Sequence, residues 1–177
     1  LSCPVTAAPE HESGLGCIER AFNHREHHDT LFQIYQELIP AAADSGIPHV
    51  ITFSGNREGI SDQEGLDNCA LGLERVLPLA EEHNVVLVME LLNSKVDHPD
   101  YQCDHTSWGV ELCRKIDHPR FKLLYDIYHM QVMEGDVIAT IRENIDYIAH
   151  FHTAGVPGRN ELDANQELNY PAIAQAI

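Results

Sequence analysis

Short runs of apolar residues recur along the chain at fairly even intervals. Each run is rich in β-branched or aromatic residues, which is typical of buried strands. Most of the runs lack the strict polar–apolar alternation of a half-exposed strand. This favours strands that are covered on both faces, as in a parallel sheet. The predicted strands are residues 49–53, 85–89, 121–125 and 148–152.

Between these runs, apolar residues return every three or four positions, which is the period of an amphipathic helix. Ser61 and Glu64 form a capping box that opens one such helix, and its pattern ends near Asn84. Pro78 lies inside this pattern and is expected to kink the helix or to end it early. Pro171 is expected in the first turn of a last helix. The other predicted helices are residues 29–45, 106–116 and 136–147.

The alternation of strands and helices predicts a parallel sheet with right-handed crossovers. Such a sheet is either an open doubly wound sheet or a (β/α)8 barrel. No GxGxxG or GxxxxGK[ST] motif follows a predicted strand, which weakens the nucleotide-binding open sheet. We therefore expect the α/β class and a (β/α)8 TIM barrel. Residues 1–177 are expected to form one domain, truncated at both ends, with about six of the eight βα units.

Polar side chains follow the predicted strands, where barrel enzymes keep their chemistry. Glu90, Asp126 and the pair His150 and His152 come from three successive strands. Two carboxylates with an imidazole from this pair favour a site for Mg²⁺ or Mn²⁺. Asp126 and His129 cannot share one strand face, because residues i and i+3 point in opposite directions. One of them is therefore expected to reach the site from the loop. Other candidates at the strand ends are Ser54, Asn56, Arg57 and Asn93.

The net charge of the chain indicates which kinds of molecule it binds. The chain has 11 Lys and Arg against 28 Asp and Glu, which gives a formal net charge of −17. This excess of negative charge argues against nucleic acids and anionic membranes as partners. It suits a protein that handles small molecules or cations. Lys95, in a polar loop over residues 93–101, is a candidate partner for an anionic substrate.

The five cysteines are odd in number and form no CxxC pair. A disulfide framework or a cysteine-based zinc site is therefore not expected, and a reducing compartment is favoured. No apolar run approaches the ~18 residues of a membrane span, and no signal-peptide pattern is visible. These observations predict a cytoplasmic protein.

Six motifs, taken together and in order, resemble those of the hydroxypyruvate isomerase family, which belongs to the xylose isomerase-like TIM barrels. The similarity extends over nearly the whole chain from about His11 onward. Each motif is weak by itself, and the order of all six makes the match specific. The motifs are residues 53–57, 89–95, 124–130, 150–155, 157–159 and 167–171.

The resemblance implies a (β/α)8 barrel that holds one divalent metal ion, most simply Mg²⁺ or Mn²⁺. By motif, three of the family's metal ligands fall on Glu90, Asp126 and His152. The fourth ligand, a second glutamate, has no counterpart in the 177 residues and is expected beyond Ile177. Without that glutamate we expect the chain alone to be marginally stable and inactive.

The reaction that the resemblance implies is the isomerisation of hydroxypyruvate to tartronate semialdehyde through a metal-stabilised cis-enediolate. Glu90 would transfer one of the protons while bound to the metal, and the second glutamate would transfer the other. His129 would steady an oxygen of the enediolate. Arg159 or Lys95 would hold the substrate carboxylate, and the guanidinium fork of Arg159 suits it better. Asn56 is a further candidate for substrate binding, and His150 is expected to have a supporting role.

Three other functions remain open. The same site serves a 2-oxo-tetronate isomerase or a ketose 3-epimerase, and the shape of the pocket decides between them. A metal-dependent endonuclease on the same barrel would need more histidine ligands and a basic rim, which the charge balance disfavours. The third possibility is a non-catalytic barrel that binds a metal or a sugar. A small hydroxy acid, oxo acid or sugar is the expected partner, and a homo-oligomer is possible.

Overall fold

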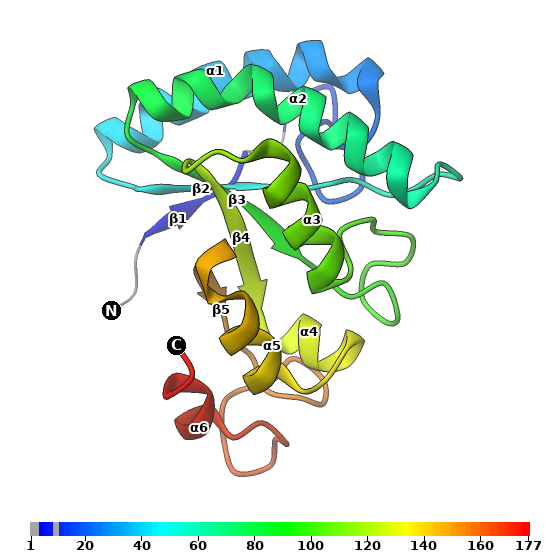
Figure 1. The fold of residues 1–177 in the computed structure, drawn as a ribbon, viewed down its shortest axis with the longest axis vertical. Helices are drawn as coiled ribbons and strands as arrows, with labels where there is room; N and C mark the ends of the chain where they lie inside the picture. Colours follow the sequence, from blue (N-terminus) through cyan, green and yellow to red (C-terminus); the bar gives the residue numbers. More distant parts are fainter. Residues whose placement is uncertain (1–3, 9–10) are drawn as a thin grey trace.

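The computed structural model describes residues 4–8 and 11–177. Five parallel strands form one sheet in which the strands follow each other in sequence order, with helices on the connections (Figure 1). This is the arrangement of consecutive βα units in part of a TIM barrel. The strands are β1 (Val5–Thr6), β2 (His49–Thr52), β3 (Val86–Leu91), β4 (Phe121–Asp126) and β5 (Ile148–His152).

The four predicted strands are confirmed as β2 to β5, and their parallel pairing is confirmed as well. The described residues form five strands of an incomplete barrel, against an expectation of about six units. β1 was missed because a two-residue strand has no readable period; Val5 and Thr6 pair with His49 and Val50. After β5, the described chain forms a long loop and a short helix up to residue 177 and adds no further strand.

The helices form a layer over the sheet. α1 packs against α2, and α2 packs against α3, along one side of the strands (Figure 1). The helices predicted from apolar periodicity are confirmed in position, with α5 ending in a turn of 3-10 helix at Ile145–Tyr147. The helices are α1 (His28–Asp44), α2 (Asp62–Glu82), α3 (Thr106–Ile116), α4 (Ile127–Met133), α5 (Val137–Asn144) and α6 (Tyr170–Ala174), with a 3-10 turn at Arg25–His27 before α1.

Two helical features differ from the prediction. Pro78 does not end α2, which continues to Glu82 because Val76, Leu77 and Ala80 keep its inner face buried on both sides of the proline. α4 was not predicted at all, since seven residues span too few turns to show a period. It begins directly after Asp126, whose side chain accepts a hydrogen bond from the first turn. The predicted helix at Pro171 is confirmed as α6.

The core lies on both faces of the central strands. Leu87, Val88 and Met89 follow one another in β3 and are all fully buried, as are Leu123 and Leu124 in β4. This explains why these runs show no polar–apolar alternation. In the part of the chain that the structure describes, no helix is both long and apolar enough to cross a membrane. The four cysteines in that part are free, and Cys3 and Leu1 lie outside it.

The capping box at the start of α2 leads to a stability prediction. The Ser61 hydroxyl accepts a hydrogen bond from the backbone N–H of Glu64 at 3.1 Å. Ser61→Ala removes this acceptor and is expected to lower the free energy of unfolding by about 1 kcal/mol. Ser61→Asp keeps an acceptor oxygen and serves as the control. Urea unfolding followed by circular dichroism measures both; equal stability of the two variants would contradict a role for the cap.

Candidate active site

The three predicted metal ligands lie on one face of the sheet at its carboxyl edge. In the strand register, Asp126 is paired with His152, while Glu90 is paired with Leu124, two positions earlier on β4. Glu90 therefore lies one pleat below the other two and on the same face. Its side chain is one methylene longer than that of aspartate, which lets its carboxylate reach the level of Asp126 and His152.

The ligand atoms of these three residues lie within 4.8 Å of one another. Nδ1 of His152 is 2.9 Å from Oε1 of Glu90 and 3.8 Å from Oδ2 of Asp126. The two carboxylates are buried, and His152 is about one third exposed. Burial raises the pKa of Asp126, and the hydrogen bond to Glu90 raises the pKa of His152. Both shifts show that the two buried carboxylates lack sufficient positive charge around them. A cation next to Glu90 and Asp126 is therefore favoured.

The donor set fits a divalent cation. Ligands that lie about 2.1 Å from an octahedral ion are separated by about 3 Å when adjacent and about 4.2 Å when opposite. The nitrogen-to-oxygen separations of 2.9 and 3.8 Å at His152 fall within or close to this range. A cation between the three side chains would also take the place of the proton that His152 now shares with Glu90.

Asp126 uses its two oxygens for different purposes. Oδ1 accepts a hydrogen bond from the backbone N–H of His129 at 3.1 Å and so caps the N-terminus of α4. Oδ2 faces His152 and lies 3.7 Å from Nη2 of Arg159. The carboxylate thus fixes the start of the helix and the position of the ligand oxygen together.

His129 lies on α4, not in a loop as the sequence suggested, because the chain turns into a helix at Asp126. The imidazole is fully buried, and its Nε2 lies 3.9 Å from Oδ2 of Asp126 without a hydrogen-bond partner. Burial, reinforced by the positive charge of Arg159, lowers the pKa of His129 to about 3. This side chain is therefore neutral next to the three candidate ligands.

Arg159 lies in the loop that follows β5, where its backbone adopts a positive φ of 58°. Its guanidinium stacks over the ring of Tyr128, 5.6 Å from the ring centroid, and remains about half exposed. It borders a hollow beside the end of β5 that is also lined by Thr153 and Asn160. A cation in this position is available to an anionic molecule that enters the hollow.

The structure does not bring Lys95 or Asn56 into contact with these groups. Nζ of Lys95 donates to the carbonyl oxygens of Val132 and Met133 and so caps the C-terminus of α4. The carbonyl of Asn56 accepts hydrogen bonds from the chain between β1 and α1, and its backbone N–H donates to Glu19. Both residues stabilise the surroundings of the site through these contacts.

The other candidates at the strand ends also have structural partners. Arg57 is bound to Asp62 and Asp104, with its Nη2 3.0 Å from the buried Asp104. The Ser54 hydroxyl accepts from the backbone N–H of Cys103 at 3.0 Å. The ring of His150 lies 5.3 Å from that of His152 in an edge-on arrangement. These contacts hold the loop after β3 and the end of β5 around the site.

Sequence reasoning did not identify Asp97 and Tyr128 as part of this region. The Tyr128 hydroxyl donates to Oδ2 of Asp97 at 2.8 Å, and Nδ2 of Asn93 donates to the same oxygen at 2.7 Å. Asn93 in turn contacts His129. The signal that could have found this network is the N-x-x-x-D spacing directly after β3, which suits a side chain that closes a tight loop on itself.

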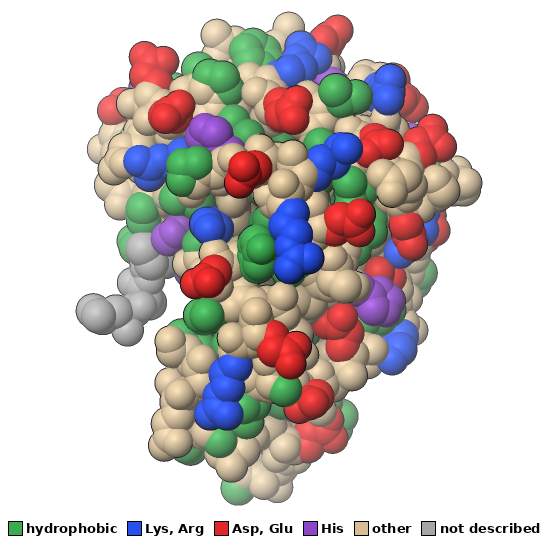
Figure 2. All heavy atoms as spheres, viewed as in Figure 1, with side chains coloured by type: hydrophobic (Ala, Val, Ile, Leu, Met, Phe, Trp, Pro, Cys, Tyr) green, Lys and Arg blue, Asp and Glu red, His purple; other side chains and the backbone are tan. Residues whose placement is uncertain are grey.

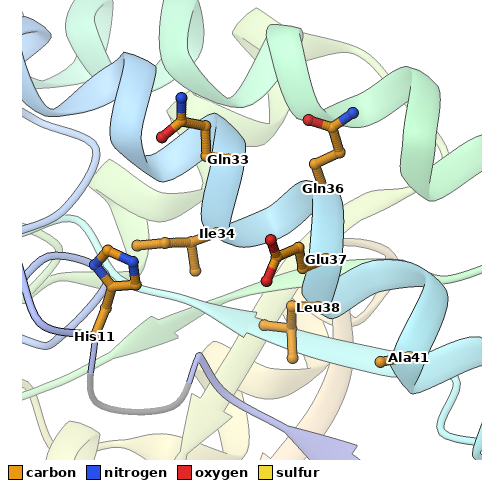
Figure 3. A pocket seen from close by; sticks show the side chains of 7 residues that line it. All are labelled: His11, Gln33, Ile34, Gln36, Glu37, Leu38 and Ala41. Carbon is orange, nitrogen blue, oxygen red and sulfur yellow. The ribbon is translucent and has the colours of Figure 1, made fainter.

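Two other parts of the surface were candidates for a functional site. On the face shown in Figure 2, Lys and Arg side chains are interspersed among Asp and Glu side chains. A separate groove lies beside α1 (Figure 3), where it is lined by His11, Gln33, Ile34, Gln36, Glu37, Leu38 and Ala41. Among the described residues that line it, Glu37 is the only acidic side chain and His11 the only imidazole, so these residues do not form a three-ligand set like that at the strand ends.

Comparisons with known proteins agree with this arrangement. The chain is 33% identical over 99 residues to a human protein named "Putative hydroxypyruvate isomerase", covering 56% of this chain and 35% of that protein. It is 34% identical over 98 residues to a 2-oxo-tetronate isomerase from Cupriavidus necator, covering 55% of this chain and 37% of that enzyme. These alignments thus span little more than a third of the length of either relative.

The fold is found in solved structures as well. A structure described as an AP endonuclease, family 2, from Brucella melitensis superposes with a TM-score of 0.87 at 22% identity, covering 99% of this chain and 67% of that one. At this identity the likeness shows the fold alone. Residues 3–177 match the family described as "Xylose isomerase-like TIM barrel". The chain therefore belongs to the xylose isomerase-like TIM barrel family.

Proposed function

We propose that this chain carries the active site of a metal-dependent isomerase that converts hydroxypyruvate to tartronate semialdehyde. The observation that carries the proposal is the convergence of Glu90, Asp126 and His152 within 4.8 Å at the carboxyl ends of adjacent parallel strands. His129 and Arg159 lie beside them. The names of the relatives, a hydroxypyruvate isomerase and a 2-oxo-tetronate isomerase, support a small hydroxycarbonyl acid as the substrate.

Glu90, Asp126 and His152 would hold one divalent ion. Two carboxylates and one imidazole, without a thiolate, favour Mg²⁺ or Mn²⁺. Such an ion supplies positive charge that polarises a carbonyl group and stabilises the negative charge that develops on its oxygen. The burial of both carboxylates strengthens this electrostatic effect, because little water competes with it.

Glu90 would be the group that moves the proton. In the isomerisation, a base removes a proton from the hydroxyl-bearing carbon next to the carbonyl. The C–H electron pair forms the carbon–carbon double bond of an enediolate, and the carbonyl electron pair moves to oxygen. A proton then returns to the former carbonyl carbon, and the hydroxyl proton is transferred to the former carbonyl oxygen, so that an aldehyde and a new hydroxyl group complete the reaction. A carboxylate can serve as this base when it lies within hydrogen-bond reach of the carbon.

The neighbouring residues orient the substrate. The buried imidazole of His129 has its unpartnered Nε2 3.9 Å from Oδ2 of Asp126 and would hydrogen-bond an oxygen of the enediolate. The Arg159 guanidinium would bind the substrate carboxylate with two parallel hydrogen bonds. Lys95, the alternative cation, is already bound to the end of α4.

A 2-oxo-tetronate isomerase is the second candidate, and a relative with that name at 34% identity favours it. Its substrate class has the same 2-oxo acid group and differs in the length of the hydroxylated chain. The same residues would perform the same proton transfer. Turnover of hydroxypyruvate and of a four-carbon 2-oxo acid, measured side by side, distinguishes the two.

Removal of one ligand tests the metal site. Asp126→Asn replaces a charged ligand by a neutral one and is expected to weaken Mn²⁺ binding at least about tenfold. His150→Gln, on the same strand face but outside the three-residue set, is the control and should keep the affinity within about threefold. Isothermal titration with Mn²⁺ measures both. Equal weakening by the two substitutions would argue against Asp126 as a ligand.

Glu90→Gln tests the base. The amide cannot accept a proton, so kcat for hydroxypyruvate is expected to fall by about two to four orders of magnitude while the fold is retained. Turnover is measured in the full-length protein, because the second glutamate is expected beyond Ile177. Mn²⁺ is kept in excess of its Kd, and a circular dichroism spectrum checks the fold. Activity near that of the unsubstituted protein would rule out Glu90 as the proton-transfer group.

Arg159 and Lys95 can be separated by their effect on KM. Arg159→Ala removes a charge-assisted pair with the substrate carboxylate and should raise KM for hydroxypyruvate about tenfold or more. Lys95→Met is the control and should change KM less than twofold. The inhibition constant of dihydroxyacetone, which has no carboxylate, should be the same for Arg159→Ala and the unsubstituted protein. A rise in KM with Lys95→Met alone would reverse the assignment.

A further inference from the structure

One buried polar atom beside the candidate ligands has no partner within the described part of the chain. Nε2 of His129 is inaccessible to solvent, accepts and donates no hydrogen bond, and lies 3.9 Å from Oδ2 of Asp126. Buried nitrogens without partners are uncommon in proteins. What this atom can do depends on whether it carries the proton of the imidazole or a lone pair.

The contacts of the other ring nitrogen, Nδ1, show where the proton is. The backbone N–H of Asn93 points at Nδ1 of His129 with an N-to-N distance of 3.2 Å. A backbone N–H can only donate, so Nδ1 must be an acceptor and cannot carry a proton. The ring is then neutral, and its single N–H proton is on Nε2.

The side chain of Asn93 reinforces the same assignment. Its Oδ1 accepts hydrogen bonds from the backbone N–H groups of Val96 at 3.0 Å and of Asp97 at 3.1 Å. Its Nδ2 donates to Oδ2 of Asp97 at 2.7 Å and lies 2.7 Å from Nδ1 of His129. Rotating the amide by half a turn would place its N–H groups against two donors and its oxygen against a carboxylate. The amide orientation is therefore fixed, and it too presents a donor to Nδ1.

We propose that Asn93, held in one orientation by Asp97, is a positioning residue that keeps His129 in the Nε2–H tautomer, so that His129 presents an N–H donor to a substrate oxygen. The proposal rests on the isomerase function given above. Asn93 does not itself touch the reacting atoms, because it lies on the Nδ1 side of the ring. It acts through His129.

This arrangement suits a reaction in which charge develops on oxygen. A neutral imidazole with Nε2–H can donate to the enediolate oxygen and holds its own proton, whereas the opposite tautomer would present a lone pair to that oxygen and repel it. The charged form would compete with the cation for the oxygens of Asp126. Fixing the tautomer in advance avoids a reorganisation during the reaction.

Asp97 is suited to hold the amide because two donors converge on one of its oxygens. Besides Nδ2 of Asn93, the Tyr128 hydroxyl donates to Oδ2 at 2.8 Å. The distance of 3.8 Å from that oxygen to Nδ1 of His129 is too long for a direct hydrogen bond. Asp97 therefore leaves Nδ1 to Asn93.

The test is nuclear magnetic resonance of the histidine ring nitrogens in the metal-free protein, with the His129 signals identified by their loss in His129→Gln. We expect an unprotonated Nδ1 and a protonated Nε2 at neutral pH. A protonated Nδ1, in the neutral or the charged ring, would overturn the proposal. This measurement requires neither an active enzyme nor a substitution at Asn93.

Two variants test whether Asn93 determines the tautomer of His129. Asn93→Asp keeps the backbone N–H but replaces the Nδ2 donor by a carboxylate. The side-chain contact to Nδ1 is the shorter of the two, at 2.7 Å against 3.2 Å, so the carboxylate should outweigh the backbone donor and shift the ring signals towards protonation of Nδ1. Asp97→Asn keeps an amide oxygen for both donors and should retain the original tautomer. In turnover assays, Asn93→Asp should lower kcat about tenfold or more and change KM less than threefold. Unchanged ring signals in Asn93→Asp would refute the role of Asn93.

The isomerase function and the tautomer of His129 can be disproved separately. The expected tautomer without turnover of any 2-oxo acid by the full-length protein would count against the isomerase and leave the geometry of Asn93 and His129 intact. Turnover of hydroxypyruvate with an Nδ1-protonated His129 would support the isomerase and refute the tautomer. If Asn93→Asp does not fold, the ring signals of the unsubstituted protein still decide the central claim.

Discussion

The carboxylate of Asp126 is the interaction on which the rest of the site depends. It is the last residue of β4 and the residue that caps α4. One oxygen receives the N–H of His129, and the other faces Arg159 and His152. A buried carboxylate is costly unless hydrogen bonds and positive charge surround it. The N-terminus of α4, Arg159 and His152 offset that cost. Burial of this carboxylate therefore favours a fold in which these three groups lie next to Asp126.

The loop after β3 is held by a second set of buried contacts. The hydroxyl of Tyr101 donates to the carbonyl of Glu90 at 2.9 Å and accepts from the backbone N–H of Ser54 at 3.1 Å. Arg57 joins the same loop to β2 through Asp104, which is also bound by the Ser94 hydroxyl. The loop is therefore tied to the ends of β2 and β3. Such ties limit the movement of Asn93 relative to His129.

Much of the sheet could be predicted from the sequence because burial on both faces removes alternation. The four long strands, the cap at Ser61 and the place of Glu90 and Asp126 at neighbouring strand ends follow from local patterns. His150 and His152 share one strand face, so parity could not choose between them, and only the family resemblance singled out His152. β1 and α4 could not be predicted, since each is too short to show a period. The role of Lys95 was equally hidden, because a helix C-terminus can be capped only by a lysine that folds back on it, and that depends on the tertiary fold.

The site divides into parts with different origins. Glu90, Asp126 and His152 project from strands, whose positions are fixed by a shared hydrogen-bond ladder. Arg159 and Asp97 come from loops, and Tyr128 comes from the short helix α4. Residues on loops can change without moving the strands. We therefore expect that the chemistry of a barrel of this kind is set by its strand residues. The size and charge of the substrate are then set by the loop after β5, the loop after β3 and the first turn of α4.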